Sequence, residues 1–159
     1  MHLIQYAVIK LGGRIVYQRA PSLRVYNPSD FPAGKLHNDR DYHHQPSELN
    51  FWLPIAERCF ESNSLWVESQ PNLGDFHPLN LEYGEYCRFY GNLCRHRTVP
   101  NNSNHTRVSL DFRVVSEASG GHDPLFRKGI RRGSKSKFQT AFDIGGFYDE
   151  MIIEKCDIS

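Results

Sequence analysis

The chain has 159 residues, a formal net charge of +1 and an apolar share of 39%. This length suits one domain, so we expect residues 1–159 to form a single unit. The nearly balanced charge gives no global reason to expect nucleic acid or an acidic membrane as a partner.

The sequence also carries signals about its compartment. No apolar stretch approaches the roughly 20 residues that a membrane helix requires, and the first residues lack the pattern of a secretory signal. The four cysteines form no C-x-x-C pair, which argues against a zinc ribbon or a thioredoxin-like motif. We therefore expect a cytoplasmic protein with free thiols and no membrane contact.

In chain order, the first predicted elements are short and apolar. Residues 2–10 form an apolar segment that ends at Gly12-Gly13. Residues 71–80 are predicted as a long turn region, and nothing between residues 10 and 115 carries a sustained helical period with caps. Strands are predicted at residues 14–18, 23–26, 48–55, 64–69, 86–89, 93–97 and 107–115. Many short strands with Gly, Pro and Asn between them predict an all-β barrel or sandwich, and the period alone does not choose between these two.

The composition changes at residues 116–137, where glycines alternate with six Lys or Arg residues. One interpretation is a solvated loop. The other is a lid at the open end of a barrel, whose positive charge attracts an anionic substrate. Residues 138–159 are expected to add one more strand, or a short helix near residues 149–155.

Three residues suggest a metal site. His37 and Asp39 are two positions apart, and alternate residues of an extended chain point the same way, so both can face one ion. His96 lies near the end of a predicted strand, where a barrel can bring it opposite. Two histidines and one carboxylate form the facial triad of non-haem Fe(II) oxygenases, which leaves metal positions open.

Two further residues suggest a cosubstrate site. Arg107 and Ser109 share one face of the predicted strand 107–115. Open metal positions can take the keto-acid end of 2-oxoglutarate, and the distant carboxylate of that molecule then requires a fixed cation. A planar guanidinium beside a hydroxyl suits this task. We therefore expect Fe(II) at His37, Asp39 and His96, with 2-oxoglutarate held by Arg107 and Ser109.

These residues belong to an ordered set of motifs that resembles the phytanoyl-CoA dioxygenase-like branch of the 2-oxoglutarate oxygenases. The motifs are, in order, His37-Asn38-Asp39, Asn50-Phe51-Trp52-Leu53-Pro54, Glu61-Ser62-Asn63-Ser64-Leu65, His96, and Pro100-Asn101-Asn102-Ser103 before Arg107. The stretch is also similar to a smaller group named for a streptomycin-biosynthesis protein. The resemblance implies a double-stranded β-helix (a jelly-roll, cupin-like barrel), Fe(II), 2-oxoglutarate, and oxidation of an unactivated C–H bond in a small molecule.

The sequence departs from that branch at its beginning. Members of the branch usually carry a longer helical region before the barrel, whereas this chain reaches its metal motif at residue 37. Two explanations stay open: a shortened chain, or a minimal one whose pocket is completed by a partner subunit of a homo-oligomer.

Other polar residues near these motifs have less specific interpretations. His43 and His44 compete with the proposed ligands, but their polar loop favours solvent exposure or substrate contact. Arg24 and Arg113 are expected to form ion pairs at the barrel rim, with substrate contact as a second role for Arg24.

The candidate substrate residues are Asn50, Trp52, Arg24 and Tyr42. Asn50 and Trp52 share one face of their strand, while Phe51 and Leu53 share the other, and the sequence leaves open which face lines the pocket. We expect a small-molecule substrate, with an anionic group if the basic segment is a lid. The alternatives are a cupin-like metal enzyme that does not use 2-oxoglutarate, and a non-catalytic ligand-binding barrel.

Overall fold

The computed structural model of the chain describes residues 13–116 and 145–153. Within these ranges the regular elements are strands, apart from two single-turn 3₁₀ helices, and no helix could cross a membrane. The elements are β1 (Gly13–Gln18), β2 (Ser22–Tyr26), η1 (Asp39–Tyr42), β3 (Leu49–Pro54), β4 (Arg58–Cys59), η2 (Glu61–Asn63), β5 (Trp66–Val67), β6 (His77–Pro78), β7 (Leu81–Glu82), β8 (Cys87–Phe89), β9 (His96–Arg97), β10 (Arg107–Ser116) and β11 (Tyr148–Ile153).

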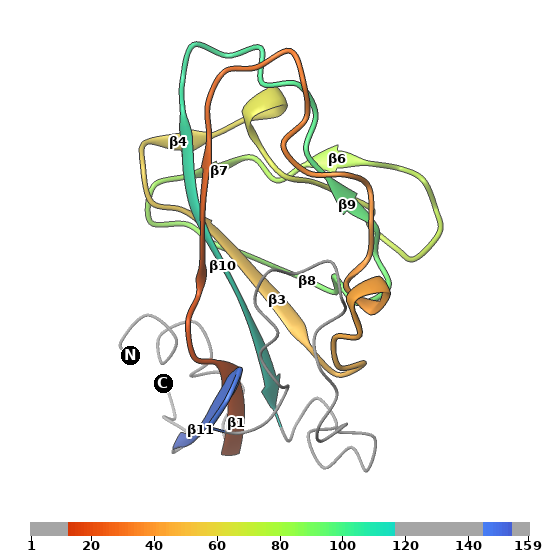
Figure 1. The fold of residues 1–159 in the computed structure, drawn as a ribbon, viewed down its shortest axis with the longest axis vertical. Coiled ribbons are helices and arrows are strands. Elements are labelled where there is room, and N and C mark those ends of the chain that lie inside the picture. Colours follow the sequence, from red (N-terminus) through yellow and green to blue (C-terminus); the bar gives the residue numbers. More distant parts are fainter. Residues whose placement is uncertain (1–12, 117–144, 154–159) are drawn as a thin grey trace, which may run out of the picture.

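The larger sheet is built around β10, which runs through most of the height of the molecule (Figure 1). Its order is β11-β1-β10-β3-β8, and β2 pairs with the first half of β10. All of these pairings are antiparallel. Between β1 and β2 the strand is interrupted around Pro21, which has no N–H to donate to a ladder.

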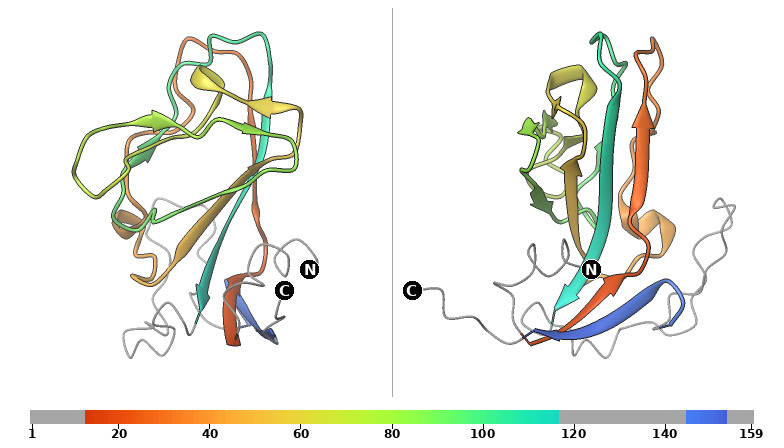
Figure 2. Two further views of the ribbon diagram at one scale, coloured as in Figure 1. Left: turned by 180° about the vertical axis from the view of Figure 1, so that it is seen from behind. Right: turned by 90° about the vertical axis from the view of Figure 1, so that its left-hand side faces the viewer.

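The second layer consists of shorter strands. It contains the sheet β6-β5-β9 and the pair β4-β7. A bridge between His37 and His96 extends the β6-β5-β9 sheet by one more chain segment. Figure 2 shows the short strands stacked to one side of β10, while β11 crosses the end of the molecule beside β1. Two facing sheets of antiparallel strands form the jelly roll that the sequence predicts.

The side chains of β10 alternate between an apolar and a polar face. Phe112 and Val114 belong to a buried cluster on one face of the larger sheet, together with Ile15, Tyr17, Phe51 and Leu53. Arg107, Ser109 and Arg113 point the other way and are all buried. Because buried polar groups require partners, this second face is where a functional site is expected.

Most strand predictions are confirmed, with corrections in the second layer. The predicted turn region at residues 71–80 contains β6, which pairs with β5. Strand 93–97 is reduced to His96–Arg97, and the sequence analysis missed β4 and β7. For the tail, β11 is a strand rather than a helix. The basic segment at residues 116–137 lies outside the described residues, except for Ser116.

Candidate metal centre

The first two predicted ligands are positioned by a turn rather than by a strand. His37 pairs with His96 through two backbone hydrogen bonds of 3.2 and 2.8 Å, one in each direction. Asn38 is extended (φ −115°, ψ 160°) and caps the 3₁₀ helix that begins at Asp39. The extended residue keeps His37 and Asp39 on one side, as predicted, although the chain turns immediately afterwards.

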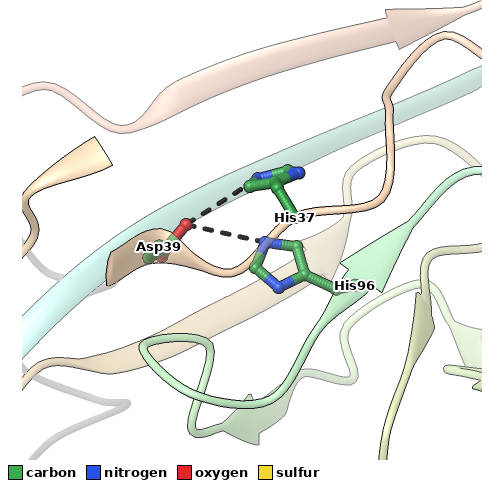
Figure 3. A group of neighbouring side chains, drawn as sticks. All are labelled: His37, Asp39 and His96. Carbon is green, nitrogen blue, oxygen red and sulfur yellow. Dashed lines mark ion pairs between the residues drawn. The ribbon is translucent and has the colours of Figure 1, made fainter. Parts of the chain in front are cut away.

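The structure brings His37, Asp39 and His96 together. Their ligand atoms all lie within 4.8 Å of one another. Oδ1 of Asp39 is 3.6 Å from Nε2 of His96 and 3.9 Å from Nε2 of His37. Figure 3 shows one carboxylate oxygen facing both imidazole rings. Asp39 and His96 are buried and His37 is half-buried, so the cluster is open on one side.

Hydrogen bonds to the backbone fix the tautomer of both histidines. Nδ1 of His37 lies 2.8 Å from the carbonyl of Lys35, and Nδ1 of His96 lies 3.1 Å from the carbonyl of Cys94. A carbonyl only accepts, so each Nδ1 carries a proton, and Nε2 is the ring nitrogen left to face Asp39 and to bind a metal ion. Burial, assisted by neighbouring His96, lowers the pKa of His37 and favours its neutral form. Metal-ligating histidines commonly show this arrangement.

The second oxygen of Asp39 is occupied by donors from the larger sheet. Oδ2 accepts hydrogen bonds from Nδ2 of Asn50 at 2.6 Å and from Nε of Arg113 at 2.8 Å. Burial, the largest single influence, would raise the pKa of Asp39, but the Arg113 guanidinium together with His96 and His44 outweighs it and holds the pKa well below its usual range. The carboxylate is therefore ionised, with one oxygen paired and the other facing the histidines.

Arg113 differs from its prediction, because it lies in the interior and not in an ion pair at the barrel rim. It is only 5% exposed and lies beneath Asp39. Its place on β10, six residues after Arg107, signals the polar face, because even spacing keeps side chains on one side. Arg24 does form the expected rim ion pair, with Nε 2.7 Å from Oδ2 of Asp111.

His44 is buried and not exposed to solvent, while its alternative prediction as a substrate contact stays open, since it lines the cavity described below. Its side chain is 1% exposed, and Nδ1 lies 2.8 Å from Oε2 of Glu48. Glu48 further accepts from the hydroxyl of Tyr148 and lies 3.7 Å from Nε of Arg113. A buried polar network thus connects β11 to the support of Asp39. His43, in contrast, is exposed, as expected.

The second predicted pair, Arg107 and Ser109, has unsatisfied atoms. Arg107 is 4% exposed, donates one bond of 3.3 Å to the carbonyl of Asn63, and has its guanidinium over the rings of Tyr26 and Trp52 at 5.1 and 5.9 Å. Within the described part of the chain, neither Nε of Arg107 nor Oγ of Ser109 has a hydrogen-bond partner. Burial lowers the pKa of Arg107. Such unpaired buried groups are costly unless a ligand satisfies them.

One cavity connects the two groups of residues. It has a volume of about 650 Å³, within the usual range for small-molecule sites, and its wall includes His37, Asp39, His96 and Arg107. Ser109 lies behind that wall rather than in it. No sequence pattern points to Asn63 as a partner of Arg107, because this contact is made by the backbone carbonyl of Asn63.

The four candidate substrate residues all line this cavity. Asn50 and Trp52 face it, which settles the open question about β3, whereas Phe51 and Leu53 belong to the apolar cluster on the other face. Asn50 is already bonded to Asp39, so it supports the centre rather than being free for a substrate.

Tyr42 and Arg24 lie on the more accessible part of the cavity wall. Tyr42 lies edge-on to His37, with ring centroids 5.1 Å apart. The side chain of Arg24 is 51% exposed, which leaves it open to solvent while it pairs with Asp111.

Comparison with known proteins adds one relative by sequence. No protein-family model matches the chain. It is 34% identical over 135 residues to the streptomycin biosynthesis protein StrG of Streptomyces griseus. The aligned part covers 85% of this chain and 60% of StrG, so the chain spans less than two thirds of that relative's length.

Solved structures show the same fold at low sequence identity. The non-haem monooxygenase ThoJ, as a nickel complex, has a TM-score of 0.53 and 15% identity, covering 71% of this chain and 49% of its own. Apo ThoJ has a TM-score of 0.56 and 14% identity, and the match covers 71% of this chain and 51% of ThoJ. CytC3 with Fe(II) and alpha-ketoglutarate has a TM-score of 0.52 and 17% identity, and the match covers 73% of this chain and 54% of CytC3. These likenesses confirm the jelly-roll fold.

Proposed function

We propose that this chain is an Fe(II)- and 2-oxoglutarate-dependent oxygenase that oxidises a small molecule at an unactivated C–H bond. The observation that carries the proposal is the convergence of His37, Asp39 and His96, whose candidate ligand atoms all lie within 4.8 Å of one another. Similarity to StrG and the fold shared with ThoJ and CytC3 support the same class. Assignment to the phytanoyl-CoA dioxygenase-like branch rests on the order of the sequence motifs.

The donor set fits iron. Nitrogen and oxygen ligands lie about 2.1 Å from an ion of this kind, so neighbouring ligands at right angles are about 3 Å apart. The observed separations of 3.6 and 3.9 Å would therefore close by about 1 Å or less on binding. Two imidazoles and one carboxylate would leave three positions of a six-coordinate ion open. Iron bound here, together with its cosubstrate, would supply the oxidising chemistry.

The Arg107 end of the cavity fits the distant carboxylate of 2-oxoglutarate. Nε of Arg107 and Oγ of Ser109 are buried and have no partner among the described residues, and the same holds for Oδ1 of Asn63 and Nε of Arg97 nearby. A carboxylate in the cavity would accept from Arg107, and the buried rings of Tyr26 and Trp52 beside it strengthen such a charge-assisted bond. Ser109, behind the cavity wall, would reach the carboxylate only after a shift of that wall. A cupin-like enzyme without 2-oxoglutarate has no use for this unpaired cation.

The substrate is proposed to be a small molecule that carries an anionic group. Lys35 and Arg24 add exposed positive charge to the cavity wall, and clustered cations raise the local concentration of anions. Arg24 is partly neutralised by Asp111, so Lys35 is the less compensated of the two. Tyr42 and Trp52 supply the aromatic part of the wall.

The testing experiment measures succinate release from 2-oxoglutarate by the purified chain with Fe(II) and oxygen, across a panel of metabolites. We expect substrate-stimulated succinate release in the wild type and none in Asp39→Ala, with exposed Asp30→Ala as the matched control. Metal binding without consumption of 2-oxoglutarate would instead favour the cupin-like enzyme. A chain that binds neither iron nor 2-oxoglutarate would be a ligand-binding barrel.

A further inference from the structure

We infer that Arg113 is a positioning residue that restricts Asp39 to binding metal through one oxygen. The inference rests on the proposed metal site and adds a residue that its three ligands do not include. A carboxylate can bind an ion through one oxygen or through both, and the second mode would occupy one of the three positions needed for cosubstrate and dioxygen.

Two fixed donors hold the second oxygen. Nε of Arg113 and Nδ2 of Asn50 approach Oδ2 of Asp39 at 2.8 and 2.6 Å. Asn50 cannot reverse its amide freely, because its Oδ1 accepts a 3.1 Å hydrogen bond from the amide of Gly91. The space there is also filled, since a Cβ at Gly91 would lie 2.7 Å from the Asn50 side chain. Oδ2 is therefore engaged away from the histidines, and Oδ1 alone faces them.

The guanidinium of Arg113 is also held by residues other than Asp39. Its Nη1 lies 3.2 Å from Oε1 of Gln18 and 3.4 Å from Oδ1 of Asp111, while Glu48 lies 3.7 Å from Nε. These partners come from β1, β10 and the residue before β3, so the guanidinium spans the larger sheet. A planar guanidinium group that is hydrogen-bonded at several atoms is a rigid support for a carboxylate.

Charge alone points in the opposite direction, which makes the inference testable. A cation beside a metal ligand repels the ion, so loss of Arg113 should not weaken metal binding by electrostatics. A residue with a purely structural role would lower metal affinity and fold stability together when removed. A residue that restricts the carboxylate would instead change how many water molecules the bound ion retains.

The experiment counts water molecules on Mn(II) bound to the full chain, from the broadening of its EPR lines in ¹⁷O-enriched water. We expect three waters in the wild type, two in Arg113→Met, and a return to three in Arg113→Lys, which restores a cationic donor. Addition of 2-oxoglutarate should displace two waters in the wild type, and its affinity should fall about tenfold or more in Arg113→Met. Mn(II) affinity should stay within about threefold. Arg14→Gln removes an exposed ion pair with Glu150 at the edge of the sheet and serves as the control.

Each contrary result has a distinct meaning. Three waters on both the wild type and Arg113→Met would overturn the inference while leaving the proposed function intact. A wild type that binds no divalent ion would overturn both. If Arg113→Met does not fold, the double variant Arg113→Met/Glu48→Gln removes one buried charge of each sign, and two waters on its bound ion are again expected.

Discussion

Two arginines on the polar face of β10 differ in what surrounds them. Both are almost fully buried, at 4% exposure for Arg107 and 5% for Arg113. Arg113 contacts three carboxylates and an amide oxygen, whereas Arg107 donates to one carbonyl and keeps an unpaired Nε. Arg113 is satisfied by the protein, and we propose that Arg107 is satisfied by a ligand. Burial identifies neither role; the partners do.

The largest expected effect concerns the ligand that Arg113 supports. Asp39→Ala removes the anionic ligand, so Mn(II) or Co(II) affinity should fall by more than about 100-fold, beyond the effect of a supporting residue. Isothermal titration of the metal-free chain measures it, with Asp30→Ala as the exposed control. Near-native affinity in Asp39→Ala would show that the metal site lies elsewhere.

The next effect separates the two arginines by stability. Arg113→Met leaves Asp39 buried without its cation, which should cost about 3–5 kcal/mol of the free energy of unfolding without metal. Urea denaturation monitored by tryptophan fluorescence measures this loss. A cost near zero would mean that the buried network tolerates the uncompensated carboxylate. Arg113 would then not be the residue that stabilises buried Asp39.

Arg107→Met should behave in the opposite way. Removing an unpaired buried charge should leave the free energy of unfolding unchanged or higher. The affinity of the metal-loaded chain for 2-oxoglutarate should fall by about 2–5 kcal/mol, the scale for a desolvated charge that loses its partner. Calorimetry measures both the metal and the cosubstrate affinity. Unchanged affinity for 2-oxoglutarate would make Arg107 structural.

The smallest effect tests the hydroxyl beside Arg107. Because Oγ of Ser109 has no partner among the described residues, Ser109→Ala should not destabilise the fold. It should weaken 2-oxoglutarate binding by about 0.5–1.5 kcal/mol, the value of one hydrogen bond. Ser47 also has a buried, unpaired Oγ, so Ser47→Ala is the matched control. Equal effects of both substitutions would remove Ser109 from the cosubstrate site.

The same two arginines show what the sequence could predict. The sequence predicts a cosubstrate role for Arg107, because it follows His96 by eleven residues and shares a strand face with Ser109. Arg113 lies on that face too, but its role depends on Asp39, 74 residues away in sequence. The sequence pattern gives the face of a strand, whereas the contact with Asp39 depends on where η1 lies over the larger sheet, in which Arg113 is paired with Asn50.

The short strands were harder to predict for a related reason. Strands β4, β6 and β7 are two residues long, and two residues show no alternation. They pair as strands because neighbouring segments of the second layer lie beside them, not because of a pattern in their own sequence. His44 was misplaced because a polar loop usually faces solvent, and only the buried carboxylate of Glu48 explains its position. The long strands and the cluster of His37, Asp39 and His96 were thus predictable from the sequence. The buried polar residues that support this cluster were not.

The backbone pairing of His37 with His96 ties the metal centre to the assembly of the barrel. The two ligands are directly opposite residues of an antiparallel bridge, so they are neighbours only in one register. A slip of one residue would turn one imidazole to the other side of the sheet. The proposed metal site therefore forms only when these two segments pair, and a bound ion would in turn stabilise that pairing. Amide exchange at these two residues would then report the loading of the site directly, because each of the two N–H groups donates across the bridge.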